Sequence, residues 1–113
     1  MTGTIPADVL AICELNDKLR QTRTGGRVYL SQGIAALGDL SISEILALVV
    51  TFDEFTAEND PYGEHDCAVV NWQGQRVLFK IDYFDPTLQS HSDDPTDPKM
   101  TMRVMTVMFA SEY

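Results

Sequence analysis

Three consecutive residues, Glu64, His65 and Asp66, combine two carboxylates with an imidazole, and Lys80 and Asp82 follow in a later apolar run. A carboxylate beside an imidazole fixes its tautomer and raises its basicity, and a nearby ammonium group can stabilise developing negative charge. His65, Asp82 and Lys80 would then be the catalytic residues of a minimal hydrolase or transferase. The alternative interpretation is a charged pair and a histidine that close the solvent-exposed end of a hairpin.

A β-hairpin over residues 66–83 is expected to position this cluster. Two runs of alternating apolar residues flank a Gln-Gly pair at 73–74, which suits a two-residue turn. In that register His65 stands opposite Asp82, and Lys80 lies on the same face one position further in. One face of the hairpin is largely apolar and is expected to pack against helices.

Two helices are expected to cover this face. The first begins near Pro6, whose fixed φ suits a first helical turn, and it ends before Gly25. Ser41 and Glu44 have the spacing of a capping box, so the second helix is expected to begin there. Its apolar positions continue for about 16 residues, which places its end near Glu58.

The remaining segments complete one domain of residues 1–113. Residues 27–33 are expected to form a short strand. Residues 85–99 hold three prolines and four aspartates without periodicity, which indicates a long loop. In residues 101–113 the alternation and β-branched content favour a strand, although this methionine-rich run is also compatible with a helix. The predicted fold is α+β, in the order αβαβββ, with an antiparallel sheet packed against two helices.

The negative charge of the chain is regional. The net charge is -9, and residues 53–97 hold eleven acids and two bases, whereas the rest of the chain holds six of each. Such a surface repels the phosphates of nucleic acids and attracts basic protein surfaces, and interleaved tyrosines add cation–π contacts. The alternative is that the acids only keep the protein soluble. The candidate partner-binding residues are Glu58, Asp60, Tyr62, Glu64, Asp66, Asp85, Asp93, Asp94 and Asp97.

These observations favour an interaction protein over an enzyme. The expected partner is a basic protein surface, such as that of a nucleic-acid-binding host protein, and direct contact with nucleic acid or membrane is not expected. The sequence shows no nucleotide-binding loop and no nucleophile motif. It also shows no signal or membrane-spanning segment, so a cytoplasmic location is expected. A homodimer is compatible with these features.

No cofactor or metal is expected from the sequence. Cys13 and Cys67 lie far apart, lack the spacing of zinc ligands, and are expected to be buried free thiols. The alternative is a Ca²⁺ or Mg²⁺ site with oxygen ligands from Asp60, Glu64 and Asp66, or from Asp93, Asp94 and Asp97, although neither run matches a calcium-binding EF-hand loop.

Four segments, "FTAENDPYGEHD", "FKIDYFD", "SDDPTDP" and "RVMTVMFASEY", occur in this order. Together they resemble a family of small alphaproteobacterial proteins of unknown function, often encoded on plasmids, phages and integrated elements. The resemblance covers roughly residues 12–113. It implies an anti-defence role, in which an acidic protein blocks a basic groove. The chain departs from the pattern at Cys67 and Phe79, so neither is expected to be essential. The positions that match are Asn59, Asp60, Pro61, Gly63, Glu64, His65, Asp66, Lys80, Ile81, Asp82, Tyr83, Asp85, Asp94, Pro95, Arg103 and Tyr113.

Overall fold

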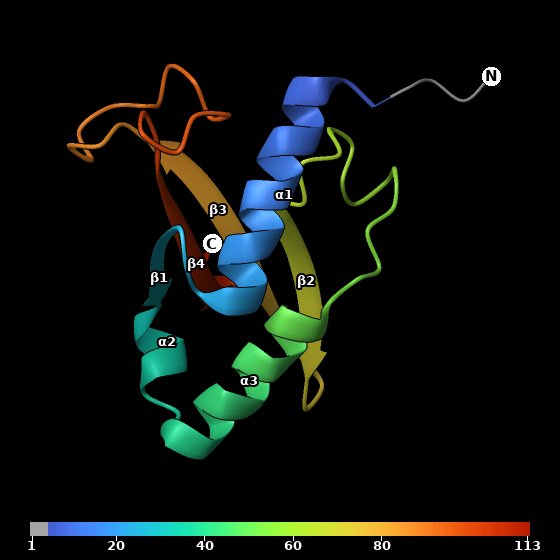
Figure 1. Cartoon of the computed structure of the whole chain (residues 1–113). Helices are drawn as coiled ribbons and strands as arrows, with labels where there is room; N and C mark the ends of the chain where they lie inside the picture. The colour runs from blue at the N-terminus through green and yellow to red at the C-terminus, as the bar shows by residue number, and fades with distance from the viewer. Residues whose placement is uncertain (1–4) are drawn as a thin grey trace.

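A computed structural model describes residues 5–113 (Figure 1). The first helix, α1 (Ala7–Thr22), starts directly after Pro6, as predicted, and ends where Arg23 adopts a left-handed backbone conformation. Its side chains Ile12 and Leu19 are buried in the core. The apolar spacing of the sequence therefore located this helix correctly.

Four strands form one sheet in the order β1-β4-β3-β2. The predicted α+β class is confirmed, and the C-terminal segment is a strand rather than a helix. Strands β2, β3 and β4 are antiparallel, but β1 runs parallel to β4 at the edge, so the sheet is mixed. The bounds are β1 (Gly26–Leu30), β2 (Cys67–Trp72), β3 (Gln75–Phe84) and β4 (Met102–Phe109).

A glycine allows β1 to lie beside β4. A Cβ at Gly26 would lie 2.5 Å from the carbonyl oxygen of Arg103 and 2.9 Å from the side chain of Leu19. Any larger residue would force β1 away from both β4 and α1, because backbone atoms cannot yield as a flexible side chain can. The edge strand therefore depends on this one position.

The hairpin has the predicted turn and register. Gln73 and Gly74 have φ values of 50° and 77°, which are typical of the two-residue turns that match strand twist. Pairing runs from Cys67 opposite Lys80 to Trp72 opposite Gln75. The side chains of Ala68, Val70 and Trp72 alternate into the core, as the sequence predicted.

The second helix differs from the prediction. A short helix α2 (Gln32–Ala35) and a longer helix α3 (Asp39–Thr51) replace the helix expected to begin at Ser41 and end near Glu58. Ser41 lies inside α3, whose N-cap is Gly38, so the predicted capping box is wrong. Glu44 instead accepts a hydrogen bond of 3.2 Å from Trp72 Nε1. Its local spacing suited a cap, but the tertiary contact with β2 engages its carboxylate.

The end of α3 is determined by a residue of α1. The guanidinium Nη1 of Arg20 donates hydrogen bonds to the carbonyl oxygens of Val49, Val50 and Phe52, at 3.0, 3.2 and 2.8 Å. Helix ends leave carbonyl groups without intrahelical partners, and a cationic donor satisfies them. The apolar pattern continues beyond Thr51, but the helix does not, because Arg20 binds the carbonyls there.

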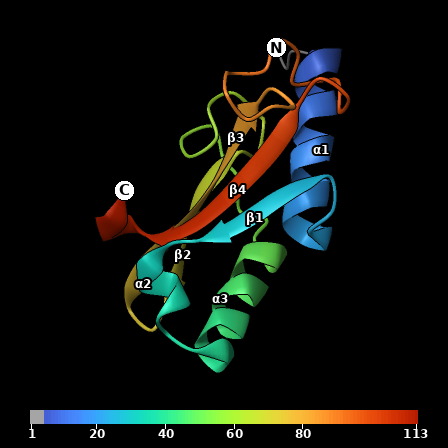
Figure 2. The ribbon, with the colours of Figure 1, turned by 90° about the vertical axis from the view of Figure 1, so that its left-hand side faces the viewer.

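The helices α1 and α3 lie on one face of the sheet, and the short 3-10 helix η1 (Ala110–Glu112) lies away from them at the C-terminal end of β4 (Figure 2). The core lies between α1, α3 and the sheet. Within residues 5–113, no helix is long and apolar enough to cross a membrane. The buried core side chains include Ile12, Leu19, Ile45, Val49, Val70, Val77, Phe79, Ile81, Met105 and Val107.

The long loop between β3 and β4 is present as predicted, and its aspartates organise its backbone. Asp85 Oδ1 accepts hydrogen bonds from the amides of Thr87 and Gln89, and Asp94 Oδ1 accepts one from the amide of Thr96. Short acidic side chains commonly close turns in this way. Several acids of this loop therefore have a structural role whatever else they do.

Candidate functional site

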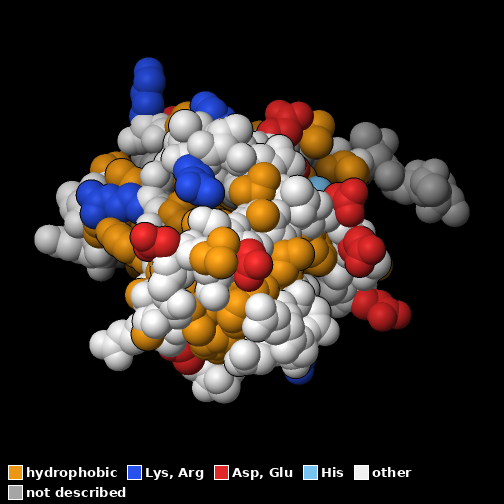
Figure 3. All heavy atoms as spheres, turned by 90° about the horizontal axis from the view of Figure 1, so that it is seen from below, with side chains coloured by type: hydrophobic (Ala, Val, Ile, Leu, Met, Phe, Trp, Pro, Cys, Tyr) orange, Lys and Arg blue, Asp and Glu red, His pale blue; other side chains and the backbone are white. Residues whose placement is uncertain are grey.

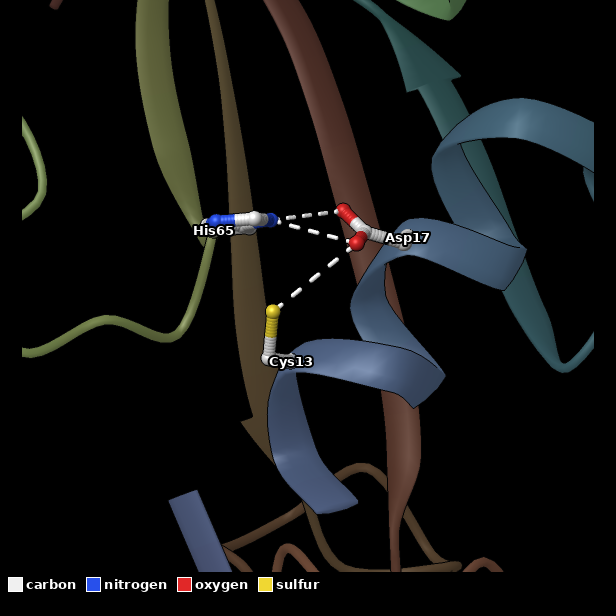
Figure 4. A group of neighbouring side chains, drawn as sticks. All are labelled: Cys13, Asp17 and His65. Atoms are coloured by element: carbon white, nitrogen blue, oxygen red, sulfur yellow. Dashed lines mark hydrogen bonds and ion pairs between the residues drawn. The ribbon is translucent and has the colours of Figure 1, made fainter. Parts of the chain in front are cut away.

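His65 lies against α1 rather than opposite Asp82. Its Nδ1 is 3.0 Å from Oδ1 and 3.1 Å from Oδ2 of Asp17 (Figure 4). The predicted pairing of His65 with Asp82 is wrong because β2 begins only at Cys67, and the backbone of His65 has a φ of 55° that turns the chain out of the strand. Asp82 forms its ion pair with Lys80 instead.

The predicted catalytic trio is therefore divided between two faces of the sheet. Residues 77, 79 and 81 of β3 point into the core, so the alternate residues Lys80 and Asp82 point away from the helices. His65 packs on the helix side, where it contacts α1. The interpretation as a hydrolase or transferase required His65, Asp82 and Lys80 to lie together on one face, and they do not.

Two further groups position the imidazole of His65. Its Nε2 is 3.6 Å from Oδ2 of Asp60, whose carboxylate also accepts a hydrogen bond from the His65 backbone amide at 3.2 Å. The Phe55 ring stacks on the imidazole, with centroids 3.9 Å apart and planes 5° from parallel. Asp60 was predicted to be exposed for partner binding, but it is 8% exposed and serves this local structure. Both ring nitrogens thus face carboxylates.

Cys13 completes this group from the preceding turn of α1. Its Sγ donates to Oδ2 of Asp17 at 3.8 Å, and Cys13, Asp17 and His65 each offer one ligand atom within 4.8 Å of the other two. Burial, with the negative charge of Asp17 beside it, raises the pKa of the Cys13 thiol to about 11. The thiol therefore keeps its proton near neutral pH, which does not suit a nucleophile. Of the two cysteines expected to be buried, Cys13 is half-buried and Cys67 is exposed.

A second, buried hydrogen-bond network lies beside the first. Tyr83 Oη donates to Glu64 Oε1 at 2.6 Å and accepts from Asn16 Nδ2 at 2.8 Å. Arg103 Nε donates to Asn16 Oδ1 at 2.8 Å, and another Arg103 nitrogen donates to the carbonyl oxygen of Pro95. This network connects α1, the loop before β2 and the loop before β4.

Burial controls the electrostatics of this network. It is the main cause that raises the pKa of Tyr83, and the hydrogen bond to Glu64 acts in the same direction. Burial lowers the pKa of the Arg103 guanidinium, which is 1% exposed, and raises the pKa of Asp66. Desolvation disfavours the charged form in each case. The network is suited to fixing the loops rather than to transferring protons.

The candidate partner-binding residues fall into two groups. Asp60, Asp85, Asp94 and Asp97 accept hydrogen bonds from donors of their own loops, and Glu64 accepts one from Tyr83 in β3. Asp66 is half-buried at the start of the hairpin. The exposed candidates are Glu58, Tyr62 and Asp93.

Sequence reasoning missed the contribution of α1. Cys13 and Asp17 are four residues apart, so they lie on one face of a helix, and this spacing was the available signal. Cys13 was expected only to be a buried free thiol, and no local pattern indicates that a loop residue 48 positions later would contact Asp17. Asn16 and Arg103 carried no signal of their own as buried polar partners.

Comparison with protein families assigns residues 30–112 to the family described as "Protein of unknown function (DUF3768)". The chain belongs to the DUF3768 family. The matched segment of this DUF3768 protein includes His65, Glu64, Tyr83 and Arg103, whereas α1, with its site residues, precedes it. Comparisons with curated proteins and with solved structures found no match.

Proposed function

We propose that this DUF3768 protein is an acidic interaction module that docks on a basic protein surface of the kind that binds nucleic acid. The observation that carries the proposal is the placement of its two acid-rich loops at the same end of the sheet. Residues 52–66 precede β2, and residues 85–101 join β3 to β4. Since β2, β3 and β4 are antiparallel neighbours, the start of β2, the end of β3 and the start of β4 lie at the same end.

The two loops are held in place before any partner arrives. Glu64 in the first loop binds Tyr83, and Arg103 binds Pro95 in the second loop, with Asn16 between them. A surface fixed in this way loses less conformational entropy on association than a mobile loop would. The buried network therefore supports a preformed docking surface.

An aromatic side chain stands in the first acidic loop. Tyr62 is 77% exposed, beside a shallow and mainly apolar hollow between the start of α1 and residues 57–63. Exposed tyrosines are frequent anchors of interfaces, and a ring among acids adds cation–π attraction for Arg or Lys. The hollow is lined by Ile5, Pro6, Val9, Ala57, Asp60, Pro61, Tyr62 and Gly63.

The charges are unevenly distributed on one face of the molecule. On the face that Figure 3 shows, several acidic side chains lie along the right-hand side and most basic side chains lie on the left, with further acidic side chains between them. Such a charge distribution orients an approaching basic surface and raises its rate of association. A protein with this charge also mimics the negative charge of nucleic acid. On a mobile element, it would act as an anti-defence inhibitor that occupies the basic groove of a host nucleic-acid-binding protein.

Affinity capture from the native host tests this proposal. The tagged wild-type chain is compared with a triple variant in which the exposed acids Glu54, Glu58 and Asp93 are changed to Gln, Gln and Asn. The control makes the same change of charge at exposed acids outside the region, as D8N, E14Q and D39N. We expect one basic protein to be captured by the wild type and the control but not by the first variant.

A Tyr62→Ala variant tests whether the exposed ring of Tyr62 anchors the interface. Loss of the exposed ring is expected to weaken the captured complex at least about tenfold, which is typical of an interface anchor. Tyr29→Ala is the matched control because Tyr29 is 47% exposed on β1, outside the acidic loops. Equal capture by all variants, or capture only of acidic proteins, would contradict the proposal.

A further inference from the structure

We propose that Cys13, Asp17 and His65 bind one divalent transition-metal ion of the zinc class, with a fourth position open to water. Three different ligand types converge here from two elements, α1 and the loop before β2 (Figure 4). The contact between His65 and Asp17 would suffice to hold the acidic loop on α1, and the thiol of Cys13 beside them adds a third ligand type that this role does not require. The site is therefore a property of the fold in addition to the acidic surface.

The separations of the ligand atoms suit tetrahedral coordination. With bonds of about 2.0 to 2.3 Å to zinc, tetrahedral ligand atoms lie about 3.3 to 3.7 Å apart. Cys13 Sγ is 3.8 Å from Asp17 Oδ2, and His65 Nδ1 is 3.1 Å from the same oxygen. All three ligand atoms lie within 4.8 Å of one another, so small movements of the side chains would bring them to an ion between them.

The carboxylate of Asp17 is already divided between two tasks. Its Oδ1 accepts a hydrogen bond of 2.9 Å from Nη2 of Arg20, a residue that is 2% exposed. Its Oδ2 lies near Cys13 Sγ and 3.1 Å from His65 Nδ1, which is also 3.0 Å from Oδ1. Oδ2 can therefore bind the ion as a single ligand atom while Arg20 fixes the carboxylate from behind, as outer partners of metal ligands do.

His65 has the corresponding support on its far side. Its Nδ1 faces Asp17, while Nε2 faces the buried carboxylate of Asp60 at 3.6 Å. A metal-bound imidazole almost always directs its other nitrogen to a carboxylate, carbonyl or water, which fixes the ring and the tautomer. The stacked ring of Phe55 holds the imidazole plane in addition. Asp60 and Arg20 are therefore positioning residues for two of the three ligands.

The ligand set selects the class of metal. Thiolate and imidazole ligands favour zinc and similar divalent transition-metal ions, whereas calcium and magnesium require oxygen ligands. The side chains of His65 and Asp17 are each 28% exposed, so an ion and a water can reach them. On binding, the Cys13 thiol releases its proton to solvent and forms the sulfur–metal bond, and His65 keeps a proton on Nε2 toward Asp60.

Cobalt(II) added to the full chain after removal of metals by a chelator tests the site. We expect one equivalent to bind, with the intense visible bands of tetrahedral cobalt and a thiolate-to-cobalt band in the near ultraviolet, and zinc to displace it. The chain provides matched controls because it has two cysteines and two histidines. Cys13→Ser should abolish the thiolate band, and His65→Gln should weaken cobalt binding at least about tenfold. The controls Cys67→Ser and His91→Gln should change neither the thiolate band nor the affinity for cobalt.

Asp60→Asn tests the outer partner. It leaves all three ligands in place and is expected to weaken binding by about 10- to 100-fold. Circular dichroism verifies that each variant is folded at the temperature of the titration. The proposal is overturned if cobalt binds without a thiolate band, if Cys13→Ser retains that band, if calcium competes as well as zinc, or if no equivalent binds to the folded wild type.

Discussion

Nδ1 of His65 lies 3.0 Å from Oδ1 of Asp17, although 48 residues separate the two in the chain. This contact attaches the acidic loop before β2 to a helix that precedes the DUF3768 segment. The loop that presents Tyr62 is thereby held on α1 at one end and on β2 at the other. The helix is therefore part of the structure that positions the proposed docking surface.

His65→Gln should destabilise the metal-free protein by about 1 to 3 kcal/mol. The change removes the stacking on Phe55 and leaves the buried carboxylate of Asp60 without the imidazole beside it. Urea denaturation with a chelator present measures the free energy of unfolding. His91→Gln is the control because His91 is exposed, and it should stay within about 0.5 kcal/mol of the wild type.

Tyr83→Phe isolates the second network. The variant keeps the ring but leaves Glu64 Oε1 without a donor at 2.6 Å, so we expect a loss of about 1 to 2 kcal/mol. Tyr29→Phe, which removes an exposed hydroxyl bonded to Arg27, should cost almost nothing. Equal unfolding free energies for the two variants would show that the network does not fix the loops.

Arg20→Lys tests the end of α3. Lysine retains the charge but lacks the planar donor group that binds three carbonyls of the last turn, so we expect a loss of about 2 to 3 kcal/mol. Arg23→Lys, at an exposed position just after α1, should be nearly neutral. Chemical denaturation measures the free energy of unfolding of both variants. A loss for Arg20→Lys as small as that for Arg23→Lys would contradict the assigned role of Arg20.

The hairpin was predictable because its determinants are local. A Gln-Gly turn and a period-two pattern fix the pairing within residues 67–84, and the observed register agrees. The extension of that register by two more positions, to a pair of His65 and Asp82, is wrong. The positive φ of His65, which ends the ladder, depends on contacts with Asp60 and α1 that the local pattern does not contain.

The errors at the second helix have the same origin. Ser41 and Glu44 satisfy the spacing of a cap, but Glu44 is engaged by Trp72, which lies 28 residues away. The helix ends early because Arg20, 29 residues from Val49, binds its carbonyls. The parallel placement of β1 beside β4 is likewise non-local. Periodicity thus identified most elements, whereas long-range polar contacts determined their limits and assembled the candidate site.

Asp66→Asn should stabilise the protein at neutral pH. Burial raises the pKa of Asp66 in the folded state, so its ionised form costs more free energy when folded than when unfolded. The wild type therefore gains stability relative to the variant as the pH falls and Asp66 becomes protonated. Unfolding free energies measured between neutral and acid pH should converge below the unfolded pKa of an aspartate, about 3.9. A variant that is less stable at neutral pH would contradict this reasoning.

The salt dependence of binding to the captured partner tests the central claim most directly. Dissociation constants are measured at rising salt concentration for the wild type, the E54Q/E58Q/D93N variant and the D8N/E14Q/D39N control. If the acidic loops are the docking surface, affinity falls with salt, and the slope is shallower for the first variant than for the wild type and the control. An affinity independent of salt, or the same slope for all three proteins, would contradict the account.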